Sequence, residues 1–462
     1  MHKVSSDDLK ASDYLLLPEQ VMRKNGSCRG MAVVVSQGRF ARVGPADEVC
    51  AQYPHLTPRV LPQTLLMPGL IDGHTHLTQS LGKALAFGEP SEIFRRIWVP
   101  MEGSLGPEAA YVSAKLAGLE ALRGGFTTVV DAGTRSASGL ASVAQAARDV
   151  GIRCVLGMIC NDVHHPAADQ AFDVLAKEAT QHLSTYASDA LVHPSLAISI
   201  PEVATDRMLT HVAALANEAG VTFQTHANEH LVAVERSLVA RGLRPIELLA
   251  ATQSLNPSTV LAHATLLTPH ELNLVRHSGA AVVYNPVASQ WKGNAVLNAV
   301  MMHEMGVPMA LGTDGTRYDG LRLLDAAEAT QRLTFGLATG DSSCGGGWLW
   351  IDHATHLGAA ALQLQSITGA IEEGLAADFL LIDLDVPEMA PSWDLTWEMV
   401  RLADRSQIQA VVVNGKLRLW MGWPTDWDAR ALMRDVRRMA EENITQAPIQ
   451  RIHPVADRHR QR

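Results

Sequence analysis

The sequence predicts an α/β protein in which a (β/α)8 TIM-like barrel is joined to a small β-sandwich domain formed from both chain ends. Three observations favour this fold. From residue 67 to residue 368, short apolar segments with strand character alternate with Ala- and Leu-rich segments of helical spacing, in eight such units. Eight consecutive units indicate a closed parallel barrel rather than an open sheet. Short strands precede this region, and strands return after about residue 369, where the alternation stops.

The individual elements follow from local patterns. Residues 30–35, 40–43 and 60–67 are strand candidates, and Gln37-Gly38 and Gly44-Pro45 mark turns beside them. The predicted barrel strands are residues 70–74, 127–131, 153–158, 196–200, 222–226, 259–263, 281–285 and 309–313. The clearest helical segments are residues 108–123, 140–150, 207–219 and 269–277.

The C-terminal part of the chain returns to β-structure. Residues 374–383 and 408–414 have strand character, and Gly415-Lys416 follows as the turn of a hairpin. We expect these strands to join the N-terminal ones, and residues 426–444 to form a terminal helix. The expected division is residues 1–66 and 369–425 for the two parts of the β-sandwich, 67–368 for the barrel, and 426–462 for the C-terminal helix and tail.

One glycine-rich loop, at residues 345–350, combines Gly345-Gly-Gly347 with Trp348 and Trp350. It follows the eighth strand and its helix, so it is either a mobile cover over the barrel mouth or an ordinary surface loop.

Composition excludes several classes of protein. Apolar residues make up 47% and charged residues 19% of 462, which is typical of a large globular core. The formal net charge of −10 disfavours nucleic acid as a partner. The five Cys are scattered and form no C-x-x-C pair, which favours a reducing compartment. Neither a signal peptide nor the run of roughly 20 apolar residues that spans a bilayer is found, so we expect a cytoplasmic protein without a membrane partner.

Five polar residues mark the ends of predicted barrel strands: His74, His76, His226, His263 and Asp314. In a (β/α)8 barrel all strand C-termini face one mouth, so these side chains are expected to converge. Imidazoles and a carboxylate are suitable ligands for Zn²⁺ or a similar divalent ion, and an open site of this kind activates water. The pattern therefore indicates a catalytic metal centre.

The H-x-H pair needs its context to carry weight. His74 and His76 lie on the same side of an extended strand, because side chains alternate with period two. A single H-x-H is a weak signal in a chain with 19 His, but this one follows Pro68-Gly69-Leu-Ile-Asp72-Gly73 at the first barrel strand. The simpler alternatives are a satisfied core histidine for His263 and a turn-capping carboxylate for Asp314.

Together these motifs resemble those of the amidohydrolase superfamily, and within it the mononuclear metal-dependent aminohydrolases. That branch includes the adenosylhomocysteine, guanine and cytosine deaminases and the triazine hydrolases. The resemblance covers roughly residues 40–425. The matching segments are residues 68–76, Thr225-His-Ala-Asn-Glu229, Leu261-Ala-His263, Leu311-Gly-Thr-Asp-Gly315 and the closing motif at residues 371–383.

The resemblance implies a set of ligands and catalytic groups. His74, His76, His226 and Asp314 would bind one divalent metal ion, for which Zn²⁺ is expected and Fe²⁺ or Mn²⁺ are alternatives. Glu229 and His263 would be catalytic together with Asp314. Two-metal members of the superfamily use a carboxylated Lys or a carboxylate at the fourth strand, and the predicted fourth strand offers neither, which favours a single metal.

The expected roles follow from the chemistry of each group. Asp314 would accept a proton from the metal-activated water, and His263 would orient that water. Glu229 would protonate a ring nitrogen of the substrate while hydroxide adds to the neighbouring carbon. The alternative for Glu229 is a carboxylate favoured by a helix N-terminus.

Substrate clues are fewer. Gln79, three residues after His76, resembles a Gln with which some guanine-deaminase-like members read a heterocycle, and a loop-bracing Gln is the equal alternative. The segment Ile198-Ser-Ile-Pro-Glu-Val203 departs from the His-Ala-Pro-Tyr-like segment of adenosylhomocysteine-type deaminases. Thr316-Arg-Tyr-Asp-Gly320 departs from their Asn-rich stretch. Both departures argue against a nucleoside.

We therefore expect a metal-dependent hydrolase of carbon–nitrogen bonds that deaminates a small purine, pterin, pyrimidine or triazine-like ring. One alternative on the same scaffold is hydrolysis of a cyclic amide or a ring carbon–chlorine bond. Another is a non-catalytic scaffold protein, although loss of metal ligands would accompany that role. The H-x-E and P-C-x-x-C motifs of small zinc cytidine deaminases are absent. A homo-oligomer is carried over from the family.

Overall fold

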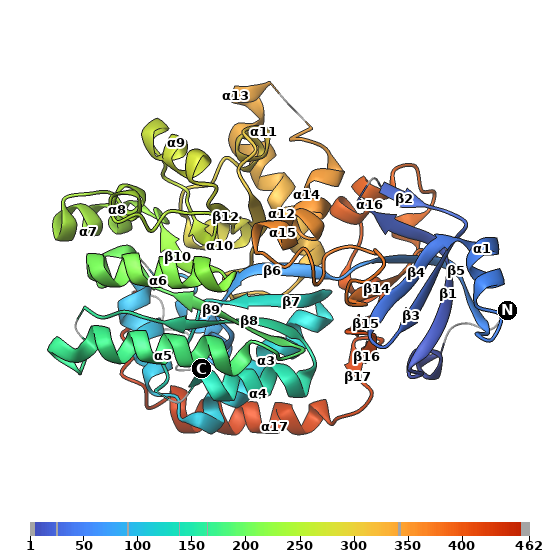
Figure 1. Ribbon diagram of the computed structural model, residues 1–462, viewed down its shortest axis with the longest axis horizontal. Coiled ribbons are helices and arrows are strands. Elements are labelled where there is room, and N and C mark those ends of the chain that lie inside the picture. The colour runs from blue at the N-terminus through green and yellow to red at the C-terminus, as the bar shows by residue number, and fades with distance from the viewer. Residues whose placement is uncertain are drawn as a thin grey trace.

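The computed structural model describes residues 5–24, 26–89, 92–137, 139–163, 165–340 and 343–453. Within these residues the chain forms an eight-stranded parallel sheet, rolled into a barrel, and a separate nine-stranded sheet built from both chain ends (Figure 1). The predicted fold class, a (β/α)8 barrel with a small β-domain from both termini, is confirmed.

The barrel strands follow one another in sequence order around the sheet. Their closure depends on the first and last strands, where Asp314 N donates to His74 O at 2.9 Å and Thr313 N donates to the Asp72 carboxylate at 2.9 Å. The strands are β6 Leu70–Thr75, β7 Phe126–Asp131, β8 Arg153–Ile159, β9 Val192–Ala197, β10 Phe223–Ala227, β11 Thr259–His263, β12 Ala281–Tyr284 and β13 Met309–Leu311.

Helices surround the barrel and begin and end where the sequence provides caps. The Thr205 hydroxyl accepts a hydrogen bond from Met208 N at the start of α6, and Gly220 ends that helix with a left-handed φ of 65°. The four helices expected from periodicity are present as α3, α4, α6 and α9. The full set around the barrel is α3 Pro107–Arg123, α4 Gly139–Val150, α5 Ala171–Tyr186, α6 Asp206–Ala219, α7 Leu231–Arg241, α8 Pro245–Ala251, α9 Pro269–Ser278, α10 Pro286–Lys292, α11 Ala299–Glu304, α12 Gly320–Gln331, α14 Gly347–His353 and α15 His356–Ala361.

The other helical segments are mostly short and lie between these elements or in the terminal regions of the chain. Three of them are π-helical, namely η4 Phe94–Trp98, η7 Arg332–Gly336 and η10 Ala440–Ile444. The remaining α-helical pieces are α1 Ala46–Gln52, α2 Val99–Gly103, α13 Leu337–Thr339, α16 Leu395–Arg401 and α17 Ala429–Met439. The 3-10 helices are η1 Ser6–Leu9, η2 Leu77–Gln79, η3 Lys83–Ala86, η5 Ala168–Gln170, η6 Pro201–Val203, η8 Pro387–Met389 and η9 Arg405–Gln407.

The fourth barrel strand lies earlier than residues 196–200, where the sequence places it. β9 covers Val192–Ala197 and contains Pro194, which lacks a backbone N–H. The backbone N–H groups of the even-numbered residues in this strand point toward β10. Leu196 N, for example, donates a hydrogen bond to Thr222 O at 3.1 Å. Pro194 lies before the first β10 partner, so no ladder bond is lost there.

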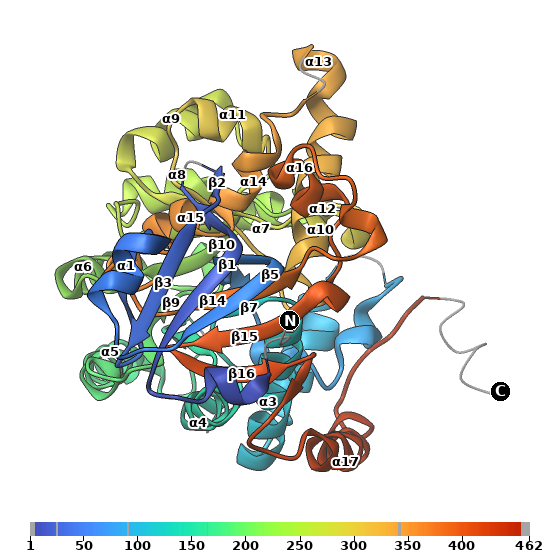
Figure 2. The same ribbon diagram turned by 90° about the vertical axis from the view of Figure 1, so that its right-hand side faces the viewer.

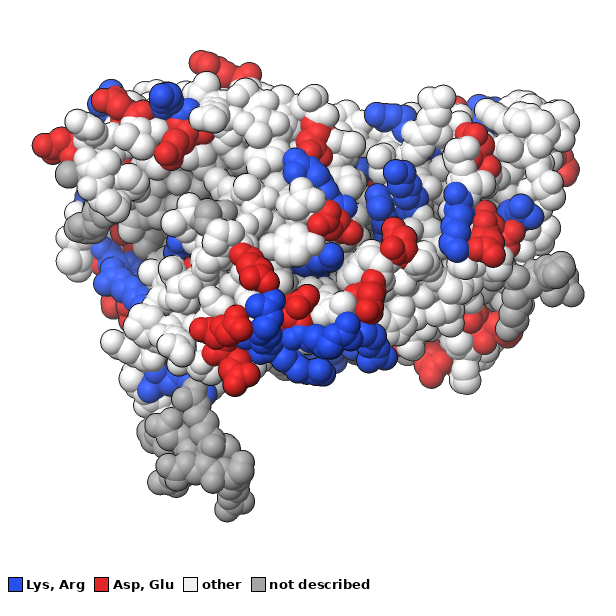
Figure 3. Space-filling view, turned by 90° about the horizontal axis from the view of Figure 1, so that it is seen from below, with Lys and Arg blue, Asp and Glu red and all other residues white. Residues whose placement is uncertain are grey.

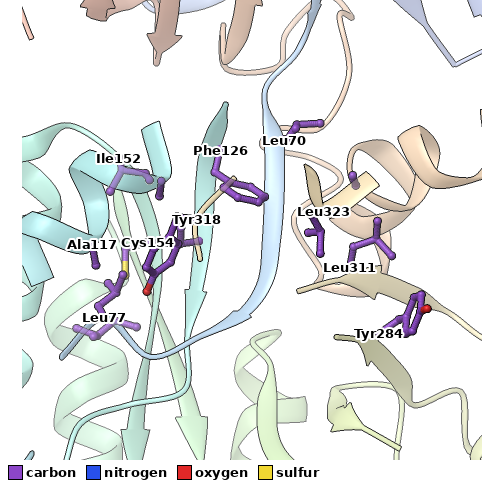
Figure 4. Packing of buried hydrophobic residues seen from close by; sticks show 14 of the residues in the cluster. Leu70, Leu77, Ala117, Phe126, Ile152, Cys154, Tyr284, Leu311, Tyr318 and Leu323 are labelled. Carbon is purple, nitrogen blue, oxygen red and sulfur yellow. The ribbon is translucent and has the colours of Figure 1, made fainter. Parts of the chain in front are cut away.

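Two apolar layers hold the barrel together. Inside the ring, side chains such as Ile71, Val130, Val260 and Val283 pack against one another and against the segment after α15, which closes one end. Outside it, the strands pack on the helices. Figure 4 shows part of this outer layer, where Leu70 and Phe126, a Cα pair of the β6–β7 ladder, lie side by side. The barrel is therefore a filled core, and only its mouth is open to a ligand.

The second sheet brings the two chain ends together in the order β17-β16-β15-β14-β5-β1-β3-β4, with β2 paired to β1 (Figure 2). Strand β1, with 11 residues, escapes the sequence analysis because Pro18 and Glu19 interrupt its apolar pattern. The structure accommodates them with a register shift between Pro18 and Gln20. The strands are β1 Asp13–Arg23, β2 Gly26–Cys28, β3 Met31–Ser36, β4 Arg39–Pro45, β5 Pro58–Pro68, β14 Phe379–Asp383, β15 Ile408–Val413, β16 Lys416–Trp420 and β17 Trp423–Pro424.

This sheet curls so that its two ends face each other like the layers of a sandwich. Phe40 on β4 packs on Phe379 of β14, with ring centroids 6.1 Å apart. One apolar cluster contains side chains of β1, β3 and β4 together with those of β14, β15 and β16. A buried ion pair joins this domain to the barrel, because Arg153 Nε of β8 donates to Asp378 Oδ2 at 3.0 Å.

The terminal helix expected at residues 426–444 is present as α17 and η10, and α17 runs along the lower edge of the molecule in Figure 1. Figure 3, which shows this lower face, has basic and acidic side chains interspersed. Arg438 on α17, for example, pairs with Glu108 and Glu442. None of the described helices is both long and apolar enough to cross a membrane. The division at residues 66, 368 and 425 stays a prediction, and residues 454–462 lie outside the described part.

Candidate active site

The four predicted metal ligands meet at the mouth of the barrel. His74 lies on β6 and His76 directly after it, His226 lies on β10, and Asp314 follows β13. One ligand atom from each of these four residues lies within 4.8 Å of the other three. Asp314 Oδ1 is 3.5 Å from His74 Nε2 and 3.4 Å from His76 Nε2, and the Nε2 atoms of His76 and His226 are 3.3 Å apart.

The donor set suits a divalent cation. His226 Nδ1 donates to Ser199 O at 2.7 Å, so the neutral ring presents the lone pair of Nε2 to the cluster. His74 Nε2 is buried and has no hydrogen-bond partner among the described residues, which is unfavourable unless a cation accepts its lone pair. Burial lowers the pKa of His74 to about 4 and that of His226 well below its usual value, and neutral imidazole is the form that binds metal.

Close packing and hydrogen bonds between β13 and β6 fix the backbone beside the cluster. Gly312 lies against the first strand, since a Cβ added there would be 2.3 Å from Asn285 Oδ1 and 3.0 Å from His74 N. The buried Asp72 carboxylate accepts hydrogen bonds from Thr313 N and Thr313 Oγ1 at 2.9 and 2.5 Å. These contacts fix β13 beside β6 and therefore place Asp314 beside His74.

Glu229 and His263 lie beside the cluster. His263 Nε2 is 3.9 Å from Glu229 Oε1, and Glu229, His263 and Asp314 form a second compact group. Asn285 Nδ2 donates to Val283 O and to His263 Nδ1, each at 3.3 Å, so the hydrogen of the neutral His263 ring lies on Nε2, inside the site. His263 and Asp314 have left-handed φ angles of 74° and 58°, a strained conformation that often occurs at functional sites.

Lys292 is a central residue of the site that the sequence analysis missed. Its Nζ atom, at the end of α10, lies 2.7 Å from Glu229 Oε1 and 2.5 Å from Asp314 Oδ2, and Asn294 Nδ2 donates to the same Glu229 oxygen at 3.2 Å. The position of Lys292 after the seventh barrel strand could have identified it as a site residue, because the segments that follow barrel strands reach the mouth of the barrel.

The charges of this group stabilise one another. Burial by itself raises the pKa of Glu229 and of Asp314, but the Lys292 ammonium outweighs burial and holds both carboxyl pKa values below their usual range. Burial by itself lowers the pKa of Lys292, and the two carboxylates outweigh it and raise that pKa. Both carboxylates and the ammonium are therefore ionised near neutral pH.

A cavity of about 310 Å³ opens above the cluster. Gln79, the predicted substrate residue, lines it and is 4% exposed, and its side chain has no hydrogen-bond partner among the described residues. Trp98 lines the apolar side together with other bulky residues. By contrast, residues 345–350 contribute nothing to the described lining, because Trp350 is buried and Gly347 packs against the backbone of Trp397 on α16.

One wall of the cavity is the π-helical turn η4, which contributes Phe94 and Trp98. The Arg135 guanidinium lies 4.5 Å from the centroid of the Phe94 ring and donates to the buried Glu102 carboxylate at 2.5 Å. Arg135 also donates to Ser199 Oγ at 3.2 Å, and Ser199 O is the acceptor for His226. A continuous network therefore links the cavity wall to the metal-site histidine.

Comparison with known proteins identifies the family. A model described as the amidohydrolase family matches residues 65–418, which is more than half of the chain and includes all the site residues above. The chain belongs to the amidohydrolase family. A shorter match, to an imidazolonepropionase-like composite domain of bacteria, covers residues 32–55 among the N-terminal strands.

Curated relatives of this amidohydrolase carry deaminase names. The chain is 28% identical over 416 residues to a 5-methylthioadenosine/S-adenosylhomocysteine deaminase of Nitratidesulfovibrio vulgaris, covering 88% of this chain and 91% of the relative. A protein of the same name from Syntrophobacter fumaroxidans is 28% identical over 388 residues, with 84% and 87% covered.

Solved structures share the fold. An adenosine deaminase from Xanthomonas campestris with bound zinc superposes with a TM-score of 0.85 at 25% identity, covering 94% of this chain and 99% of that one. An atrazine chlorohydrolase from Arthrobacter aurescens TC1, complexed with zinc, has a TM-score of 0.80 at 20% identity, with 92% and 100% covered. The latter identity is low enough that it shows the fold alone.

These comparisons confirm the superfamily expected from the sequence, and they confirm the class of hydrolytic enzyme that acts on carbon–nitrogen bonds. They also support a divalent metal, since the His, His, His and Asp group is present and relatives of this fold bind zinc. The roles of the individual side chains stay predictions.

Proposed function

We propose that this amidohydrolase removes an amino group, as ammonia, from a small nitrogen heterocycle with the help of one divalent metal ion. The observation that carries the proposal is the convergence of His74, His76, His226 and Asp314 at the base of a cavity, with Glu229 beside them. Two groups of residues, one suited to a metal and one to proton transfer, share a single opening. That arrangement matches the needs of hydrolytic deamination.

The four metal-site residues would hold the ion through three imidazole nitrogens and one carboxylate oxygen. A divalent ion bound there supplies a water nucleophile at neutral pH by lowering the pKa of a bound water. We propose Zn²⁺, with Fe²⁺ and Mn²⁺ as alternatives that the same ligands accept. Support for zinc comes from the adenosine deaminase structure, which contains it.

Asp314 and His263 would handle the attacking water. Asp314 Oδ1 faces the imidazoles while Oδ2 is hydrogen-bonded to Lys292, so the Oδ1 side is the one available to accept a proton. His263 carries its hydrogen on Nε2 within the site, so it donates a hydrogen bond and would fix the direction of attack.

Glu229 would move the proton on the substrate. Its Oε1 is occupied by Lys292 and Asn294, while no hydrogen bond from the described residues reaches Oε2. Oε2 is therefore the atom that would contact a ring nitrogen. Since Lys292 keeps the free carboxyl ionised, Glu229 must first take up the proton that it delivers to the ring, and it would act as a shuttle.

The cavity supports a flat, partly polar substrate. Gln79 offers an amide with both a donor and an acceptor, and Trp98 and Trp291 provide apolar surface. The volume of about 310 Å³ extends from Asp314 to Glu92 and Arg236, so a heterocycle with a substituent also fits. We therefore include nucleosides in the screen, although two sequence segments depart from the adenosylhomocysteine-type pattern.

A screen of aminated heterocycles for ammonia release tests the proposal. Purines, pterins, pyrimidines, triazines and adenine nucleosides should be assayed with Zn²⁺-loaded wild type and with Glu229→Gln. We expect release from at least one class, and a loss of about 10²-fold or more in kcat in the variant, as is typical when a general acid–base group is removed. Full activity of Glu229→Gln would remove this residue from the mechanism.

The same assay separates the alternatives. Release of chloride, or ring opening without ammonia, would favour hydrolysis of a carbon–chlorine bond or a cyclic amide on the same scaffold. A protein that binds no metal and shows no turnover after addition of Zn²⁺, Fe²⁺ or Mn²⁺ would instead be a scaffold protein. The presence of all four ligand side chains speaks against that outcome.

We also propose a cytoplasmic setting and a homo-oligomer. Cys28, Cys50, Cys154 and Cys160 form no disulfide within the described residues, which fits a reducing compartment. The oligomer is an expectation from the family, and the molar mass in solution, measured by light scattering, tests it. A monomer at micromolar concentration would contradict it.

A further inference from the structure

The described segment after α17, up to His453, returns to the barrel domain. Figure 2 shows it rising from α17 beside the segment that precedes α3. Gln450 N donates to Arg96 O at 2.9 Å, and Arg96 Nη1 donates to Gln450 O at 2.8 Å. Residues 445–453, which we call the strap, are therefore joined by two hydrogen bonds to η4, the helical turn that forms a wall of the cavity.

Glu89 is the anchor of the strap. Its carboxylate accepts hydrogen bonds from Arg451 Nε at 3.1 Å, Ile452 N at 2.9 Å and His453 N at 3.3 Å. Arg96 donates to the same carboxylate at 3.2 Å, and the Glu89 side chain is completely buried. A buried carboxylate that receives charged and backbone donors makes strong hydrogen bonds, so this end of the strap is held firmly.

Apolar contacts continue the attachment behind the wall. Ile449 of the strap, and Ile444 at the end of η10, pack against a cluster whose buried members include Ile97 and Trp98. Trp291, which also lines the cavity, packs against the same cluster. Removing the strap would expose the rear of the wall to water, and the loss of that packing would loosen it.

The wall is a segment that needs such support. It is a five-residue π-turn followed by the short helix α2, and π-turns are rare and frequent at functional sites. Glu92, just before it, has a left-handed φ of 68°, which is unfavourable for a non-glycine residue. A strained entry and a short helix do not determine the position of Phe94 and Trp98 by themselves.

We infer that the strap is a positioning element of the catalytic site, in which the anchoring of residues 445–453 by Glu89 sets the shape of the substrate cavity through η4. It touches no reacting atom and acts only through Phe94, Trp98 and their neighbours. The inference rests on the proposed function for its kinetic consequence, but its structural consequence can be measured without any substrate.

Truncation provides the first test. A chain ended after Ile444 lacks the strap, while a control chain ended after His453 retains every contact described above. We expect backbone amides of residues 92–103 to exchange with deuterium about tenfold faster or more in the first chain than in the control. Bound metal per chain should equal that of wild type in both, because the ligands lie on other elements.

Point substitutions cover the case in which the shorter chain does not fold. Arg451 contacts Glu89 but does not line the cavity. Arg451→Ala should accelerate exchange in residues 92–103 about threefold, and Arg451→Lys, which keeps the charge, should restore part of the protection. With a substrate from the screen, the strapless chain should show a KM about tenfold higher and a kcat within about twofold of wild type, the pattern of lost binding rather than lost chemistry.

The outcomes are distinguishable from those of the functional proposal. Wild-type exchange rates at residues 92–103 in both the strapless chain and Arg451→Ala would overturn the inference that the strap positions the wall. This outcome does not depend on the identity of the substrate. A fall in kcat with unchanged KM would also overturn it, because the strap would then act on the chemistry. A failure of every heterocycle in the screen would contradict the proposed function and leave the exchange measurement valid.

Discussion

Lys292 and Asp314 share a hydrogen bond of 2.5 Å that divides the two oxygens of the carboxylate between different partners. Oδ2 faces the ammonium, and Oδ1 faces the imidazoles of His74 and His76. Lys292 also bridges to Glu229, so one cation fixes both carboxylates of the site relative to each other. The distance between Asp314, a proposed metal ligand, and Glu229, the proposed proton shuttle, therefore depends on Lys292.

Replacement of Lys292 should separate positioning from metal binding. Lys292→Met leaves two buried carboxylates without their cation, and breaking a buried pair costs about 3 to 5 kcal/mol of stability. We expect kcat to fall about 10²-fold, since both groups lose their placement. Lys292→Gln, which retains a donor without the charge, should retain more activity. Thermal unfolding and steady-state kinetics measure the two effects, and wild-type kcat in Lys292→Met would refute this role.

Removal of the metal should destabilise the protein as well as inactivate it. A ligand that binds only the folded state stabilises it by about 2.7 kcal/mol at a free concentration of 100 Kd. Dialysis against a chelator should therefore lower the Tm, and Zn²⁺ should restore both Tm and activity. In Asp314→Asn, which weakens one ligand, added Zn²⁺ should raise the Tm less. An equal response of wild type and variant would show that the ion binds elsewhere.

Arg135 should influence the metal site through Ser199 and His226, although it contacts no ligand itself. Arg135→Met leaves the buried Glu102 carboxylate without its guanidinium, so we expect a stability loss of about 3 kcal/mol. Through the Ser199 link we also expect metal affinity to fall about tenfold, as is usual when an outer partner of a ligand is removed. Competitive titration with a chromogenic chelator measures the affinity. Unchanged affinity would limit Arg135 to a structural role.

His353, which is not among the residues that line the cavity, should contribute a specific pH dependence of stability. Its Nδ1 donates to Met309 O at 2.9 Å and its Nε2 accepts from His303 Nδ1 at 3.0 Å, so the folded state needs the neutral ring. Burial lowers its pKa from 6.5 to about 4. Between these values the unfolded chain takes up the proton and the folded chain does not, so stability is lost as pH falls from 6.5 toward 4.

The size of this effect follows from the fall of the His353 pKa from 6.5 to about 4, which corresponds to about 3 kcal/mol of stability. Denaturant unfolding of wild type and His353→Gln at several pH values between 4 and 7 measures it. The variant should be less stable at pH 7 and should lose less stability on acidification. Parallel pH profiles of the two proteins would show that His353 does not titrate in this window.

The predictable part of the site shares one property: its residues lie at the C-terminal end of a barrel strand or within a few positions after it. His74, His226, His263 and Asp314 follow apolar segments, and the barrel topology alone requires their side chains to meet at the mouth. Their local neighbours, such as Gly73 and Gly315, give these positions recognisable motifs. Sequence periodicity likewise determined the barrel helices, because amphipathic spacing and caps are local features.

Other features escaped prediction because their partners are remote in sequence. Lys292 is 63 positions from Glu229, and Glu89 is 362 positions from Arg451. Strand β1 was missed because a proline and a glutamate break its pattern, and only pairing with β3 and β5 makes the segment extended. In each case the local propensities of the residues do not indicate the contact or strand that forms, because contacts between distant parts of the chain determine it.

The sequence by itself determined the barrel, the paired terminal strands and the four side chains proposed as metal ligands, because each is encoded in a short period or motif. The tertiary structure alone decided that Lys292 joins the two carboxylates, that Arg135 supports the cavity wall, and that the C-terminal segment is anchored to Glu89. The physical reason is that a buried charge is stable only beside its partner, and that partner is chosen by the folded arrangement of the whole chain.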